Sequence, residues 1–225
     1  MNKIGTITIG QSPRADILPE FEAALGRRCE LLHRGALDGL DRAAVARLAP
    51  AAGDYILVTR LRDGSEVKIA ERHIIERMKA AVVDLEAAGA DMIVLFCTGE
   101  FPDLGSKRLI LKPDQLLENV VRAVLPKGGR LAAVLPSPEQ IPILEKRWAR
   151  VSGDLVLDAV SPYTSGQAEF QAAAERVAGR KPDLVVLDCM GFGETVRSIF
   201  RRTTGRPVIL PRALLGRIAG ELAGE

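Results

Sequence analysis

Two cysteines in this chain of 225 residues stand where a thiol could do chemistry. Cys97 and Cys189 each follow an apolar run, and a glycine, Gly99 or Gly191, stands two residues after each of them. Parallel sheets bind ligands beyond the carboxyl ends of their strands, where both thiols would lie. A thiolate is a usable base near neutral pH when backbone N–H groups lower its pKa, and amides at these glycines could also hold a carboxylate. If two lobes face each other, one thiol could remove a proton from one face of a carbon and the other could return a proton to the opposite face.

Further residues that could bind a substrate lie in loops after predicted strands. Ser12 and Arg14 lie between the first strand and a helix, and a helix N-terminus favours anions. Tyr163 and Thr164 follow a later strand and could donate hydrogen bonds to substrate oxygens. We therefore treat these four side chains as candidate contacts for a small carboxylic acid.

Each candidate also has a purely structural interpretation. Cysteine is often a small buried hydrophobe, and we adopt that interpretation for Cys29, which has no counterpart in the other half of the chain. The serine of the first loop could cap a helix beside a solvated arginine. The tyrosine and threonine could belong to an ordinary polar turn.

The elements that must position these residues alternate between short apolar runs and longer amphipathic segments, a pattern typical of a parallel α/β sheet. An Asp-Gly pair at 63–64 predicts a tight turn between two strands that pair as a hairpin. Among the helices, we expect one over 15–25, with Pro13 near its first turn, and a long one over 71–88. The expected strands cover residues 4–9, 29–33, 55–59, 66–69, 91–96, 108–111, 131–135, 155–160, 183–188 and 207–210.

Three sequence matches, in the same order, indicate an internal repeat. Residues 9–13 resemble 134–138, residues 94–99 resemble 186–191, and residues 107–117 resemble 205–215. The first half is longer, and the excess falls around the predicted hairpin, which we interpret as an insertion. The fold class is therefore α/β, with two pseudo-symmetric Rossmann-like lobes and mainly parallel sheets. We predict lobes over 1–125, with the extra hairpin near 55–69, and over 126–211; the C-terminal helix, 212–225, could complete the first lobe.

Composition narrows the class of protein. The net charge is +2, from 31 basic and 29 acidic residues, and there is no long basic run, so nucleic-acid binding is not expected. No apolar stretch is long enough to cross a membrane, and the N-terminus does not read as a secretory signal. Three widely separated cysteines and two histidines form neither a disulfide framework nor a metal motif. We therefore expect a cytoplasmic protein that has no bound metal.

Three segments resemble the AroM family and, around it, the aspartate/glutamate/hydantoin racemase superfamily: residues 9–14 (IGQSPR), 96–101 (FCTGEF) and 188–192 (DCMGF). The resemblance implies two Rossmann-like lobes, frequent dimers and no metal or pyridoxal cofactor. It also implies that the two cysteines act as acid and base at the α-carbon of a small carboxylic acid, while related members decarboxylate malonates or isomerise maleate. Thr98 corresponds to a substrate-binding hydroxyl of the racemases. Met190 and Gly191 replace the Thr-His that usually follows the second cysteine, and Gln11-Ser12 replaces an acidic residue in the first loop.

These observations lead to one working hypothesis and one alternative. The hypothesis is a cofactor-independent isomerase- or racemase-like enzyme whose Cys97 and Cys189 perform acid/base chemistry on a small carboxylic acid; a homodimer is compatible with it. The alternative is a metabolite-binding or regulatory protein of the AroM family that performs no chemistry. The binding set is Ser12, Arg14, Thr98, Gly99, Tyr163, Thr164, Met190 and Gly191.

Overall fold

The structure is a computed structural model that describes residues 3–223. The chain forms two compact units, one made of Met1–Asp114 with Arg212–Glu225 and the other of Gln115–Pro211. Each unit contains its own four-stranded parallel sheet, which confirms the predicted α/β class with mainly parallel sheets. Over the described range, no helix combines the length and the hydrophobicity that a membrane span requires.

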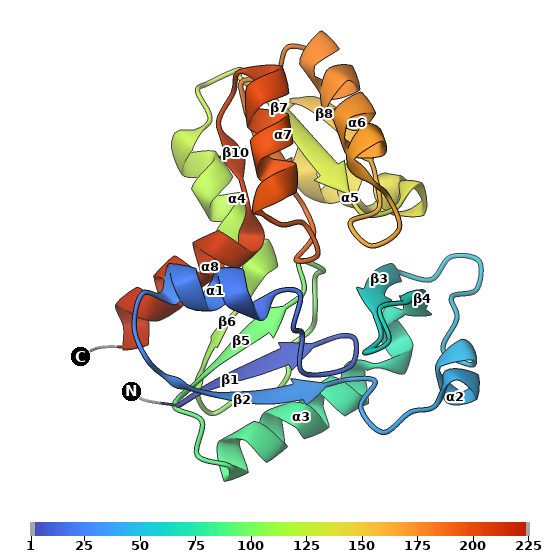
Figure 1. Cartoon of the computed structure of the whole chain (residues 1–225), viewed down its shortest axis with the longest axis vertical. Coiled ribbons are helices and arrows are strands. Elements are labelled where there is room, and N and C mark those ends of the chain that lie inside the picture. Colours follow the sequence, from blue (N-terminus) through green and yellow to red (C-terminus); the bar gives the residue numbers. More distant parts are fainter. Residues whose placement is uncertain (1–2, 224–225) are drawn as a thin grey trace. The chain divides into compact units, whose positions relative to one another are not determined.

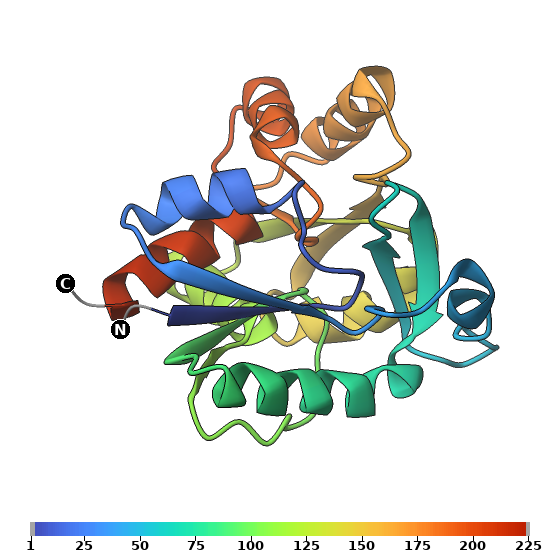
Figure 2. The ribbon, with the colours of Figure 1, turned by 60° about the horizontal axis from the view of Figure 1, so that its bottom comes forward.

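The first unit is built on a sheet whose strands follow the order β2-β1-β5-β6. The main elements of this unit are β1 (Lys3–Thr8), α1 (Leu18–Leu25), β2 (Glu30–Gly35), α2 (Arg42–Ala46), β3 (Ile56–Arg60), β4 (Glu66–Ala70), α3 (Ile75–Ala87), β5 (Met92–Phe96), β6 (Leu109–Leu111) and α8 (Pro211–Ala223). Helix α3 covers one face of the sheet, and α1 and α8 cover the other (Figures 1 and 2). Strand β5 is buried over its whole length because both faces are covered, as its unbroken apolar sequence predicts.

The second unit repeats this plan. Its main elements are α4 (Pro113–Val124), β7 (Arg130–Leu135), α5 (Ile141–Ala149), β8 (Asp154–Ala159), α6 (Gln167–Gly179), β9 (Leu184–Leu187), α7 (Glu194–Thr204) and β10 (Val208–Ile209). The sheet order, β8-β7-β9-β10, matches β2-β1-β5-β6 strand for strand. The internal repeat predicted from three short matches is therefore a repeat of topology, and Cys97 and Cys189 follow equivalent strands.

The inserted segment forms a hairpin outside both four-stranded sheets. Strands β3 and β4 pair in antiparallel register from Ile56 opposite Ala70 to Arg60 opposite Glu66. The turn between them contains Asp63 and Gly64, as the Asp-Gly pair predicts. This hairpin has no counterpart among the described residues of the second unit.

Two helix starts differ from the sequence prediction. Helix α1 begins at Leu18 rather than at residue 15, because the carbonyl of Arg14 accepts the N–H groups of both Ile17 and Leu18 in a turn that precedes the helix. Pro19, and not Pro13, therefore occupies the first helical turn. The helix expected over 71–88 begins as a short 3₁₀ turn and becomes α3 at Ile75.

Helix α8 approaches α1 through two glycines on one of its faces. A Cβ atom placed on Gly220 would lie 2.2 Å from the carbonyl oxygen of Leu25, and one on Gly216 would lie 2.5 Å from that of Phe21. Both clashes are with backbone atoms of α1, which cannot move aside as a flexible side chain could. The two helices can pack at this distance only because positions 216 and 220 carry no side chain.

We expect Gly220→Ala to lower the free energy of unfolding by about 2 kcal/mol, the usual cost of overpacking a tight interface. Urea denaturation followed by circular dichroism measures this change. Gly179→Ala is the matched control, because Gly179 also lies in a helix but has open space where its Cβ would be. Equal loss of stability in the two variants would contradict the close packing of α8 on α1.

Candidate functional site

Cys97 lies directly after β5, at the carboxyl end of the sheet of the first unit. Its side chain is nearly buried, with 8% of its surface exposed. The backbone N–H of Gly99 points to the Cys97 sulfur, with a nitrogen–sulfur distance of 3.4 Å. The neighbouring strand end is Thr8 of β1, which pairs with Phe96, so the first βα loop starts beside this cysteine.

Cys189 occupies the equivalent place in the second unit, after β9. It is 7% exposed, and the N–H of Gly191 points to its sulfur, again at 3.4 Å. The hydroxyl of Tyr163 lies 3.9 Å from the same sulfur. A Cβ on Gly191 would lie 2.5 Å from the Tyr163 ring, so this glycine lets the aromatic side chain reach the cysteine.

The two units thus hold their thiols in the same Cys-x-Gly turn. In each, the cysteine follows a strand, directly after β5 and one residue beyond the end of β9, and the second amide after the cysteine donates to sulfur. A backbone N–H that points at sulfur stabilises the anion more than the neutral thiol. Both cysteines therefore receive the same backbone donor from the glycine two residues later.

A buried ion pair lies next to the Cys189 turn of the second unit. The Asp188 carboxylate accepts a hydrogen bond from the Trp148 ring nitrogen at 2.8 Å and pairs with Arg147 at 3.3 Å. Both charged side chains are fully buried. The negative charge next to Cys189 is balanced by Arg147 of α5, a compensation that the sequence alone did not reveal.

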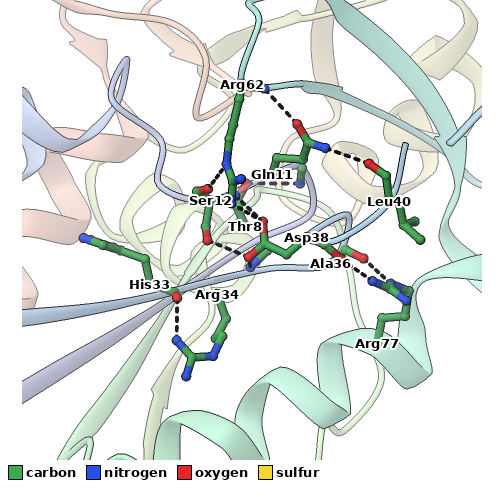
Figure 3. Close-up of polar contacts among 12 residues, drawn as sticks. Thr8, Gln11, Ser12, His33, Arg34, Ala36, Asp38, Leu40, Arg62 and Arg77 are labelled. Carbon is green, nitrogen blue, oxygen red and sulfur yellow. Dashed lines mark hydrogen bonds and ion pairs between the residues drawn. The ribbon is translucent and has the colours of Figure 1, made fainter. Parts of the chain in front are cut away.

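Ser12 lies in the loop after β1, where it is held by the turn that follows β2 (Figure 3). Its hydroxyl donates to one carboxylate oxygen of Asp38 at 2.6 Å, and its backbone N–H donates to the other at 2.8 Å. No side chain caps the N-terminus of α1, whose N-cap residue is Ile17, so Ser12 is not a helix cap.

Arg14 is buried in the same loop rather than solvated. Its guanidinium forms two hydrogen bonds with Asp16, at 2.8 and 2.7 Å, and a third with Thr8 at 3.3 Å. Burial opposes ionisation of Asp16, but the hydrogen bonds and charge of Arg14, with the charge of Arg212, hold the pKa of Asp16 below its ordinary value. The positive charge of Arg14 is therefore largely balanced by Asp16, which follows it in the same segment.

The remaining predicted contacts divide between buried and exposed positions. Thr98 and Met190, which follow the two cysteines, are buried. Thr164 is exposed, and its backbone N–H, like that of Tyr163, donates to the hydroxyl of Ser161. Of the predicted binding set, the structure brings Gly99 to Cys97, and Tyr163 and Gly191 to Cys189.

Sequence reasoning missed the role of β3 and the residue that precedes it. The hydroxyl of Tyr55 accepts the N–H of Glu100 at 3.3 Å, and Leu57 lies 2.9 Å from where a Cβ of Gly99 would be. Likewise, a Cβ placed on Gly10 would lie 2.4 Å from the hydroxyl oxygen of Thr59. These three side chains alternate along the chain and so share one face. Their alternation in the sequence was the signal that could have predicted a shared face. In the structure, this face lies against both the loop that follows Cys97 and the first βα loop.

Metal ligands do not cluster in the part of the chain that the structure describes. Among residues 3–223 there is no group of three His, Cys, Asp or Glu side chains that could hold a metal ion.

Solved proteins share this fold at low sequence identity. Arylmalonate decarboxylase is 17% identical with a TM-score of 0.60, over 99% of this chain and 92% of its own. Maleate cis-trans isomerase of Nocardia farcinica is 15% identical with a TM-score of 0.60, over 96% and 89%. Glutamate racemase of Aquifex pyrophilus is 13% identical with a TM-score of 0.60, over 98% and 83%. These likenesses confirm the Asp/Glu racemase-like fold.

Sequence comparison adds a family match. The model of the AroM protein family matches residues 4–223. No curated protein matches the chain.

Proposed function

This chain belongs to the AroM family, and on that premise we propose that it is a cofactor-independent isomerase- or racemase-like enzyme. Its substrate is a small carboxylic acid, and the reaction takes place at the α-carbon. Cys97 and Cys189 are the acid and base. The racemase, isomerase and decarboxylase named among the solved structures of this fold support a reaction of this kind.

One observation carries the proposal: the same thiol turn occurs at the equivalent strand end of both units. Gly99 and Gly191 each direct an N–H at a cysteine sulfur over 3.4 Å. A buried structural cysteine needs no such donor, because a neutral thiol is a weak acceptor. Two copies of a donor arrangement that suits a thiolate favour chemistry over packing.

The proposed step moves only protons. One thiolate takes the α-proton, and the electron pair of the broken C–H bond spreads into the carboxylate as an enediolate. The other thiol gives its proton to the opposite face of the carbon, which leaves the product and one thiolate. Proton count and electron count balance, and no oxidant or reductant is needed. The Tyr163 hydroxyl, 3.9 Å from Cys189, is suited to hydrogen-bond the sulfur or a substrate oxygen nearby.

The substrate carboxylate needs donors whose hydrogen bonds become stronger as negative charge develops on it during the reaction. Within the predicted binding set, we assign this role to the Thr98 hydroxyl and to backbone amides near Gly99 and Gly191. We assign Ser12 to the first loop of the same site. Arg14 braces that loop, because its guanidinium already binds Asp16 and Thr8.

The proposal is tested by proton exchange in deuterated water. We expect wild-type protein to replace the α-proton of at least one acid in a panel of small amino, hydroxy and dicarboxylic acids, as measured by NMR. A variant carrying both Cys97→Ala and Cys189→Ala should show no exchange above the rate without protein. If the wild type is silent across the panel while an acid still binds to the double variant, the protein is a binding protein and the proposal is wrong.

A further inference from the structure

Asp38 is the centre of a hydrogen-bond network around the first βα loop. Its carboxylate accepts from the backbone N–H and hydroxyl of Ser12, and from the N–H of Gly35 at 2.8 Å. Arg77 of α3 donates to the carbonyls of Ala36 and Asp38, and so ties this turn to the helix beneath the sheet. The turn is therefore a fixed support to which Ser12 is attached at two points.

Arg62 attaches the inserted hairpin to the same loop. Its side-chain Nε donates to the carbonyl of Ser12, and a terminal nitrogen lies 3.3 Å from Asp38. Its backbone N–H donates to the side-chain oxygen of Gln11 at 3.0 Å, and the amide nitrogen of Gln11 donates to the carbonyl of Leu40 at 3.1 Å. Figure 3 shows Gln11 and Ser12 held between Arg62 on one side and the segment of Asp38 and Leu40 on the other.

The equivalent loop of the second unit lacks this attachment. The hydroxyl of Ser137, which matches Ser12 in the repeat, hydrogen-bonds to Glu139 two residues later in its own loop. Among the described residues of that unit there is no hairpin that corresponds to β3 and β4. The contacts that hold the loop from the inserted β3–β4 hairpin therefore occur, among the described residues, only in the unit that carries Cys97.

We propose that Arg62 and Asp38 are positioning residues that hold the Gly10–Ser12 loop in the conformation in which the site works. This inference rests on the function proposed above. Neither residue needs to touch the substrate. They act through Ser12, whose backbone and hydroxyl they hold from two different elements.

We expect removal of the Arg62 side chain to change the geometry of the Gly10–Ser12 loop rather than the free energy of unfolding of the whole protein. The Arg62 side chain is 60% exposed, and exposed ion pairs contribute little to folding. Misplacing a substrate-positioning group by about 1 Å can slow a reaction by about 100-fold. Loss of Arg62 should therefore loosen one loop and lower the rate while the fold persists.

Arg62→Ala tests this, with Arg42→Ala as the matched control. Arg42 is also an exposed arginine, at 77%, and it pairs with Asp63 of the same hairpin turn. In Arg62→Ala we expect the backbone amides of residues 10, 11, 12 and 14 to exchange with deuterium about 10-fold faster by mass spectrometry. For the panel acid that wild type turns over, we expect kcat to fall at least 10-fold and KM to change less. Arg42→Ala should match wild type in both measurements.

A lysine at position 62 separates positioning from charge. Arg62→Lys keeps the positive charge but loses the planar fork of donors, so it should behave like Arg62→Ala. Unchanged amide exchange in Arg62→Ala would overturn the proposal, and so would faster exchange with an unchanged kcat. A wild-type protein that turns over no acid would overturn the proposed function, whereas amide exchange would still decide whether Arg62 holds the loop.

Discussion

We expect Cys97→Ala and Cys189→Ala each to lower turnover about 1,000-fold, the usual cost of losing one positioned acid or base. In the proposed mechanism, each single variant keeps one thiol, and for a chiral acid that thiol serves only one side of the α-carbon. Each should therefore still exchange the α-proton of only one enantiomer, and the preferred enantiomer should be opposite in the two variants. NMR of each pure enantiomer in deuterated water, with chiral chromatography for inversion, measures both quantities.

Cys29→Ala is the control for these variants. Cys29 precedes β2 in the first unit, at the amino end of the strand and so at the opposite edge of the sheet from Cys97. Its replacement should leave turnover within a factor of two of wild type. Single variants of Cys97 and Cys189 with full turnover would show that the thiols are structural. If both variants preferred the same enantiomer, the two-sided proton transfer would be wrong even though the cysteines mattered.

Arg147→Ala should destabilise the second unit by about 3–5 kcal/mol. Its partner Asp188 would remain as a fully buried carboxylate without its arginine, and an uncompensated buried charge costs about this much. Trp148 is the only tryptophan in the chain, and its ring nitrogen donates to Asp188. Its fluorescence during urea denaturation therefore reports directly on unfolding around this pair.

Arg150→Ala is the matched control, because Arg150 is half-exposed and shares the partner Glu118 with Arg147. It should cost less than about 1 kcal/mol, as exposed pairs do. Combining Arg147→Met with Asp188→Asn removes both charges, so it should recover much of the lost stability. Equal effects of the two arginine variants would contradict the buried pair, as would a double variant no more stable than Arg147→Ala.

The fold and the positions of the two cysteines could be predicted from sequence because their signals are local. Unbroken apolar runs identify strands covered on both faces, and the Asp63-Gly64 pair identifies a hairpin turn. The order of the three repeated segments then placed Cys97 and Cys189 after equivalent strands, which the matching sheet orders confirm. None of these inferences required knowledge of which side chains meet across the sheet.

Contacts between distant residues were decided by the tertiary structure alone. Arg62 meets Ser12 only because β3 and β4 fold back over the loop after β1, and Asp38 meets it only because β2 pairs with β1 in one particular register. Arg147 and Asp188 likewise meet only once α5 packs on the sheet that contains β8 and β9. A polar side chain in a sequence has many conceivable partners, and strand order, register and burial select one. The sequence by itself therefore determined where the thiols lie, and the tertiary structure decided what holds their surroundings in place.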